Sequence, residues 1–127
     1  MRDQGRGGAI INVTSDAFHQ GVPTLAPYCV SKGGMRMLMR DLAVELGPLG
    51  ITVNNVAPGA IVTPINEKIL SNKSQLDALL ANIPLGRMGK PEEVAGLVAF
   101  LASVDAAYVT GSTYVLDGGL MRNYKEQ

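Results

Sequence analysis

Three short runs rich in β-branched residues, separated by stretches of helical periodicity, most constrain how this 127-residue chain can fold. The runs over residues 9–13, 51–56 and 112–116 are expected to be buried strands. Helical patterns are expected between them, over residues 28–46 and again from Pro91 onward. A strand–helix–strand–helix–strand order predicts an α/β fold, in which crossover helices connect three strands of a parallel sheet.

Both expected helices carry apolar stripes. In the first helix, Met37 and Val44 also lie a heptad apart on the opposite side, which is typical of a helix covered by its own core and by a partner. Gly33 and Gly34 each cost about 1 kcal/mol relative to alanine in a helix, and close approach of another group is one reason to expect them. The stripe residues are Met35, Leu38, Met39, Leu42 and Leu46 in the first helix, and Val94, Leu97, Val98 and Leu101 in the second.

Residues 65–82 have weaker helical periodicity. Polar residues 71–75 interrupt the pattern, so this region is expected to be a mobile flap rather than one continuous helix. Pro91 suits the first position of the helix that follows, and Glu92 and Glu93 complement the dipole of that helix.

Charge and composition exclude several function classes. Eleven basic and eleven acidic residues give zero formal net charge, whereas nucleic-acid or membrane-surface binding favours a basic excess. The single cysteine, Cys29, cannot form an internal disulfide, which fits a reducing, cytoplasmic setting. A small buried filler is the simplest role for it. No apolar run is long enough to cross a bilayer, and no signal-peptide pattern is present.

Tyr28 and Lys32 are four residues apart, which places both side chains on one face of a helix. An ammonium beside a phenol stabilises the phenolate, so the tyrosine can exchange a proton with an alcohol or a carbonyl oxygen. The hydroxyl of Ser15, upstream across a loop, is expected to hold the same oxygen. The alternative is that Tyr28 is a packing residue at a helix start, because the Tyr-x-x-x-Lys spacing is common.

Ser15 and the Pro58–Gly59 turn each follow an expected strand. The carboxyl ends of parallel strands meet at one edge of the sheet, where ligands of such folds bind. Three separate features therefore converge on one edge: Ser15, the Tyr28/Lys32 pair and the turn.

The chain resembles the C-terminal half of a short-chain dehydrogenase/reductase from Gly7 to Gly119. The fold that the resemblance implies is Rossmann-like. No single motif is specific, but the ordered set is. The segments that carry the resemblance are residues 11–15, Tyr28 with residues 31–34, residues 53–59, 89–95, 108–111 and 117–119.

The resemblance implies a catalytic set of Ser15, Tyr28 and Lys32. Tyr28 matches the acid/base, Lys32 matches the lysine that tunes it and holds the nicotinamide ribose, and Ser15 matches the serine that binds the substrate oxygen. Tyr28 and Lys32 therefore also count as cofactor contacts. The expected cofactor is NAD or NADP, and the expected substrate is a small alcohol or carbonyl compound.

Further cofactor contacts are implied downstream. Pro58 and Gly59 match the turn that lines the nicotinamide. Ile61 matches a contact made through its backbone, and Thr63 matches one made through its hydroxyl. The flap over residues 65–82 matches a variable substrate lid, and the segments around it look most like those of glucose 1-dehydrogenase-like and 3-oxoacyl reductase-like members.

One departure from the family pattern is large. The glycine-rich turn that receives the cofactor pyrophosphate has no match here, because residues 5–8 lack both its spacing and a preceding strand. The residue that separates NAD from NADP and the catalytic asparagine are missing too, and neither Asn12 nor Asn54 can take the asparagine's role. Residues 1–127 are thus expected to be one partial catalytic domain without the nucleotide-binding half.

Two readings of function follow from this. The first is an oxidoreductase present in truncated form, which in full length is a homo-oligomer, expected to be a tetramer. The second is a non-catalytic fragment or assembly subunit of the same ancestry, unable to bind cofactor alone. His19 is expected to be an exposed loop residue outside the site, and Asp117 is explained by turn formation.

Overall fold

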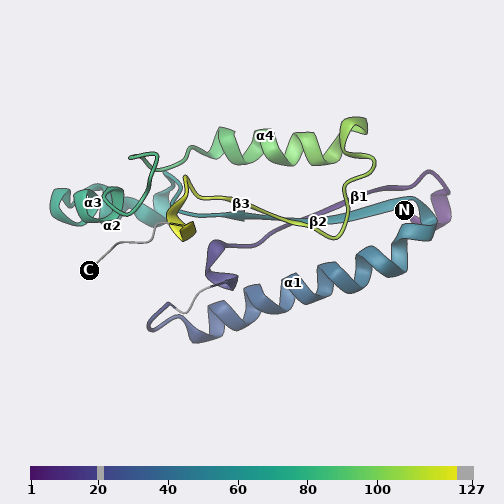
Figure 1. The fold of residues 1–127 in the computed structure, drawn as a ribbon, viewed down its shortest axis with the longest axis horizontal. Helices are drawn as coiled ribbons and strands as arrows, with labels where there is room; N and C mark the ends of the chain where they lie inside the picture. Colours follow the sequence, from purple (N-terminus) through teal and green to yellow (C-terminus); the bar gives the residue numbers. More distant parts are fainter. Residues whose placement is uncertain (20–21, 123–127) are drawn as a thin grey trace.

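The computed structural model describes residues 1–19 and 22–122 (Figure 1). The strands are β1 (Gly8–Val13), β2 (Ile51–Pro58) and β3 (Thr113–Leu116). The α-helices are α1 (Ala26–Leu46), α2 (Glu67–Leu70), α3 (Lys73–Leu80) and α4 (Pro91–Ala102). Short 3₁₀ segments are η1 (Arg2–Gln4), η2 (Asp16–Phe18), η3 (Gly47–Leu49), η4 (Pro64–Asn66), η5 (Val104–Ala106) and η6 (Leu120–Arg122).

The three strands form one parallel sheet in the order β1-β2-β3. The expected α/β fold with crossover connections is confirmed: α1 covers one face and α4 covers the other (Figure 1). The register pairs Val13 with Val56 and Pro58 with Leu116, so the carboxyl ends of all three strands reach one edge. The residues that directly follow each strand therefore lie at this edge of the sheet.

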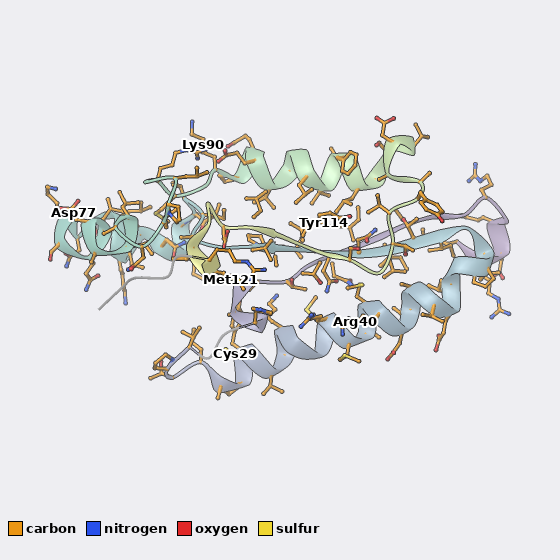
Figure 2. The ribbon with its side chains drawn as sticks, in the orientation of Figure 1. Cys29, Arg40, Asp77, Lys90, Tyr114 and Met121 are labelled. Atoms are coloured by element: carbon orange, nitrogen blue, oxygen red, sulfur yellow. The ribbon has the colours of Figure 1, made fainter. Side chains whose placement is uncertain are left out.

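The core has two layers because side chains alternate between the faces of the sheet. Val53 of β2 packs on α1, with Met39 and Ala43 buried beside it. Val56 packs on α4 with Leu101, and Tyr114 extends from β3 toward α4 (Figure 2). Both faces of the sheet are thus apolar, as parallel sheets require.

Helix α1 begins two residues before its expected start. Pro27 was expected to end the preceding loop, but it lies in the first turn of the helix, where a missing N–H costs nothing. Leu38, expected in the core stripe, is 53% exposed, because it lies about 100° around the helix from buried Met39. The opposite side carries the apolar residues Met37 and Val44, and in this single chain Val44 is 79% exposed.

The two glycines of α1 remain without a structural reason. A Cβ added at Gly33 or Gly34 would meet nothing within 4 Å, so the expected close approach is absent from the described part of the chain.

The flap region is more helical than expected. Only Ser71 and Asn72 break it, because the Asn72 side chain accepts a hydrogen bond from the Gln75 N–H at 3.1 Å and starts α3. Residues 73–75, expected to interrupt the helix, form its first turn.

Two buried asparagines of β2 hold the sheet together. Asn55 accepts from Asn12 Nδ2 of β1 at 2.9 Å and reaches Thr113 Oγ1 of β3 at 3.5 Å. Asn54 donates to the Val109 carbonyl at 2.7 Å. Asn12 and Asn54 therefore have structural roles, in keeping with their exclusion from the catalytic set.

Candidate active site

Lys32 is the residue that connects the predicted catalytic set to the sheet. Its Nζ lies 5.6 Å from the centroid of the Tyr28 ring and donates to the Val13 carbonyl at 3.2 Å. Tyr28 is in the first turn of α1, and Val13 ends β1, two residues before Ser15. The start of the helix and the end of the strand are thus held together by one ammonium group.

Ser15 lies at the N-terminus of η2, against which α1 packs. Its hydroxyl accepts from the Ala17 N–H at 3.2 Å and donates to Asp16 Oδ1 at 3.1 Å. Among the described residues no hydrogen bond connects Ser15 with Tyr28. The structure therefore places the three predicted residues around one strand end, with Ser15 capping a helical turn.

Asp16 is a residue of this edge that the sequence analysis passed over. Burial raises the pKa of its carboxyl, repulsion from Asp117 raises it further, and the hydrogen bond from Ser15 opposes the rise. Gly59 lies against both acids, because a Cβ there would be 2.6 Å from Asp117 Cβ and 3.3 Å from Asp16 Oδ2. The sequence offered two signals for this acidic pair: Asp16 directly follows Ser15, and Asp117 directly follows β3.

Asp117 has the turn role that was expected. Its carboxylate accepts from the N–H groups of Gly119 and Met121, each at 2.8 Å, and so starts η6.

Among the predicted cofactor contacts, Pro58 ends β2, and Gly59, Ile61 and Thr63 follow it at the same edge. The Ile61 carbonyl already accepts from Asn66 Nδ2 at 2.7 Å, and Thr63 Oγ1 lies 3.5 Å from the same oxygen. A ligand that uses the Ile61 backbone would therefore bind its N–H. Among the described residues, the Thr63 hydroxyl makes only this long contact, which it would give up on binding a ligand.

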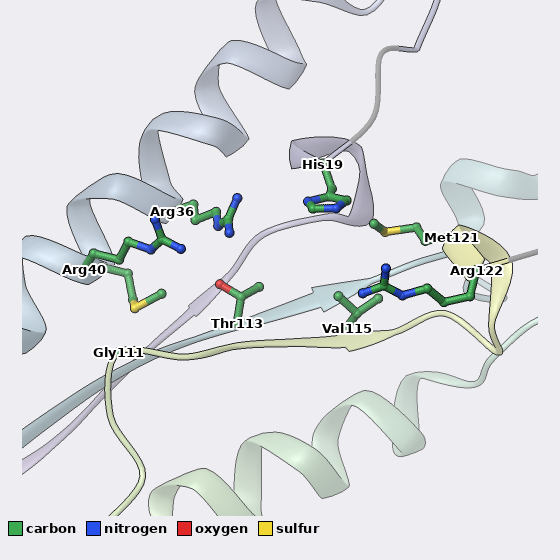
Figure 3. Close-up of a pocket in the computed structure, with 9 residues that line it drawn as sticks. His19, Arg36, Arg40, Gly111, Thr113, Val115, Met121 and Arg122 are labelled. Atoms are coloured by element: carbon green, nitrogen blue, oxygen red, sulfur yellow. The ribbon is translucent and has the colours of Figure 1, made fainter.

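Two pockets of the described structure do not contain the predicted catalytic set. One lies between α1, β3 and η6, and His19, Arg36, Arg40 and Arg122 contribute to its lining (Figure 3). The other is bounded by the loop over residues 84–89, the end of β3 and α4. Neither is lined by Ser15, Tyr28 or Lys32, and Tyr28 is 42% exposed. His19 is exposed, as expected.

Residues 5–8 lie at the amino end of β1, opposite the edge that carries Ser15. Gly8 donates its N–H to the Gly50 carbonyl at 3.3 Å, so this glycine-rich segment serves the turn before β2. Its placement agrees with the expectation that it is not a pyrophosphate-binding turn.

Three further observations concern the cysteine, metal binding and the length of the helices. Cys29 was expected to be a small buried filler, and it is half-buried. The described residues hold no cluster of three or more histidine, cysteine or acidic side chains suited to a metal ion. None of the described helices combines the length and the apolar character needed to span a bilayer.

Comparison with known families gives a match along almost the whole chain. Residues 1–121 match a family model described as enoyl-(acyl carrier protein) reductase. An L-rhamnose 1-dehydrogenase (NAD(P)(+)) of Azotobacter vinelandii is 45% identical over 123 residues, which are 97% of this chain and 48% of that protein. A 3-oxoacyl-[acyl-carrier-protein] reductase of Rickettsia felis is 45% identical over 93% of this chain and 48% of its own length.

Solved structures agree with this match. A gluconate 5-dehydrogenase from Burkholderia cenocepacia, solved with NADP and tartrate, superposes with a TM-score of 0.89 at 35% identity, over 96% of this chain and 48% of that one. An acetoin dehydrogenase from Enterobacter cloacae gives a TM-score of 0.83 at 39% identity, over 98% of this chain and 48% of that one. The chain thus spans about half the length of the relatives it matches.

Proposed function

Because this chain belongs to the short-chain dehydrogenase/reductase family, we propose that it carries the proton-transfer half of an NAD(P)-dependent oxidoreductase. The proposed reaction interconverts an alcohol and a ketone or aldehyde, with Tyr28 as acid/base, Lys32 as its cationic partner and Ser15 as the ligand of the substrate oxygen. The relatives act, by their names, on sugars, sugar acids, acetoin and acyl chains. A small hydroxyl or carbonyl compound is the substrate class proposed here.

The observation that carries the proposal is the position of the Lys32 ammonium. It lies beside the Tyr28 ring and on the Val13 carbonyl, next to the strand end that presents Ser15. A positive charge there stabilises the phenolate, so Tyr28 can take a proton from an alcohol and return one to a carbonyl oxygen. Ser15 would reorient its O–H from Asp16 to that oxygen, which holds it in place for the transfer.

A nicotinamide cofactor, when bound, supplies the hydride acceptor or donor. The donors left at the edge fit the nicotinamide end of such a cofactor: the Lys32 ammonium, the Ile61 N–H and the Thr63 hydroxyl. Pro58 and Gly59 would flank the ring from the end of β2. No residue of the described chain supplies the pyrophosphate turn at this edge, so the fit covers one end of the cofactor only.

The test restores the missing half. The N-terminal half of the Azotobacter vinelandii L-rhamnose 1-dehydrogenase is joined to this chain, and turnover is followed by the absorbance of reduced nicotinamide. Reduction of NAD(P) by an alcohol or sugar, lost in a Tyr28→Phe chimera of unchanged circular dichroism, is the expected result. A well-folded chimera that binds cofactor without turning over any of the relatives' substrates would contradict the proposal.

The second candidate, a non-catalytic product of the same ancestry, is favoured by one observation: Ser15, Tyr28 and Lys32 line neither of the two pockets described above. Turnover of the chimera described above distinguishes the two. We expect no micromolar binding by the isolated chain under either reading, but only an oxidoreductase half restores turnover when joined to the nucleotide-binding half.

A further inference from the structure

A pocket of about 180 Å³ lies on the α1 face of the sheet, away from the predicted catalytic set. Arg36 and Arg40 come from consecutive turns of α1, Arg122 comes from η6, and His19 comes from the end of η2. Thr113 of β3 adds a hydroxyl to the same wall. These residues define what we call the basic pocket.

The charge of the basic pocket differs from that of the chain as a whole. The sequence has equal numbers of acidic and basic residues, yet three arginines and the only histidine line this pocket, and none of the described aspartates or glutamates does. Like charges that line one pocket repel one another, and an anion between them offsets that repulsion.

The geometry brings these cations together from two sides. Figure 3 shows Arg36 and Arg40 extending from α1, and Arg122 extending from η6, toward the space above Thr113 and Val115. Arg40 and Arg122 take part in neither of the two ion pairs found among the described residues, Lys73–Asp77 and Arg87–Glu93. Guanidinium groups offer paired N–H donors that match carboxylate and phosphate oxygens.

We propose that the basic pocket binds a small dianion whose oxygens belong to carboxylate or phosphate groups. One end of the anion would be held by Arg40 of α1 and the other by Arg122, with the Thr113 hydroxyl as a neutral donor. The size of the pocket restricts the ligand to a few heavy atoms or to the charged end of a larger molecule. This site is separate from the proposed catalytic set, and its test does not depend on activity.

Isothermal titration calorimetry of the full 127-residue chain with inorganic phosphate and with malonate tests the proposal, with sodium chloride holding the ionic strength constant. Saturable binding of at least one dianion is expected. An Arg40→Gln/Arg122→Gln variant should weaken it by about tenfold or more, because two charge-assisted contacts are lost. Arg6→Gln is the matched control, since Arg6 is an exposed arginine near the N-terminus. The affinity of this variant for phosphate and malonate should equal that of the unmodified chain.

His19 provides a readout in the unmodified protein. It is the only histidine of the chain, so its imidazole proton signals are resolved without assignment. Phosphate or malonate at fixed pH should shift these signals saturably, and chloride at equal ionic strength should not. This measurement holds even if the double variant fails to fold.

The outcomes separate the ligand sources. Binding of phosphate alone identifies a phosphate-bearing ligand, binding of malonate alone identifies a carboxylate, and either supports the proposal. An equal loss in Arg6→Gln, or no response of His19 to either anion, overturns it. A chain ending at Arg122 is measured as well, because the acidic residue Glu126 follows closely in the sequence. If only this shortened chain binds an anion, the proposal is overturned, and the carboxylate of Glu126 is the ligand of the pocket.

Discussion

The Lys32 ammonium lies 5.6 Å from the centroid of the Tyr28 ring, one helical turn away on α1. Its hydrogen bond to the Val13 carbonyl fixes it at the end of β1. The same cation is thus in a position to tune the tyrosine and to fix the geometry of the helix against the strand.

Replacing Lys32 with methionine should damage turnover and cofactor binding together in the chimera described above. The substitution keeps the length of the side chain but removes the charge beside Tyr28 and the donor proposed for the cofactor ribose. We expect kcat to fall by more than about tenfold and the Kd for cofactor to rise. Lys68→Met on α2 is the control, and an equal effect there would contradict the assignment.

Asp16 should make stability depend on pH. Burial raises its pKa above the usual value of 3.8, so the folded chain holds this proton more tightly than the unfolded chain. The stabilisation from the proton is complete below the unfolded pKa and is lost as pH rises through the folded pKa. Asp16→Asn should therefore raise Tm at neutral pH and leave it nearly unchanged at about pH 3. A lower Tm for Asp16→Asn at neutral pH would show that the Ser15 contact outweighs the burial of charge.

Glu93 should have the opposite pH dependence. Its paired contacts with Arg87, at 2.6 and 2.8 Å, and its hydrogen bond from the Lys90 N–H lower its pKa from 4.5 to about 2. A lowered pKa gives stability that is present above pH 4.5 and is lost as pH falls toward 2. Glu93→Gln should lower Tm at neutral pH, and the difference from the unmodified chain should shrink over that range. Glu92→Gln, one residue earlier and without these contacts, controls for the helix dipole.

Most of the framework could be predicted because it depends on local periodicity. Three β-branched runs and two apolar stripes were enough to predict the parallel sheet and its two covering helices. The position of Ser15 beside the Pro58–Gly59 turn followed from strand direction alone.

What the sequence did not reveal depends on distances between segments that lie far apart in the chain. Asp16 and Asp117 are 101 positions apart, and only the pairing of β2 with both β1 and β3 brings them to one edge. Helical periodicity predicts that Arg36 and Arg40 of α1 are exposed to solvent. The fold places Arg122 of η6 in the same pocket, which the sequence pattern does not predict. Leu38 was wrongly predicted to be in the core, because residue spacing alone does not define the edge of the buried face of a helix. The elements that pack on the helix decide which residues at that edge are buried.

Self-association is expected from two open surfaces. β1 pairs only with β2, so its other edge offers unpaired backbone groups within the described structure. Met37 and Val44 are exposed on the outer side of α1. We predict that the isolated chain is marginally folded and self-associates, and that a full-length form is a homotetramer. Light scattering with circular dichroism checks this, and a monodisperse monomer that melts cooperatively would contradict it.

A matched pair of variants locates the contact. Val44→Glu should reduce association if the outer side of α1 takes part. Ile65→Glu, at an equally exposed apolar position on η4, should leave it unchanged. Equal effects of the two would assign the association to general hydrophobicity.

The central claim is that Tyr28 moves the proton, and the turnover of a Tyr28→Phe chimera tests it most directly. The substitution keeps the ring and removes the exchangeable proton, while Tyr108→Phe makes the same change at a fully exposed position. We predict a fall in kcat of about 10² to 10⁴-fold for Tyr28→Phe with little change in cofactor Kd, and unchanged kcat for Tyr108→Phe. Near-normal turnover by Tyr28→Phe would contradict the account.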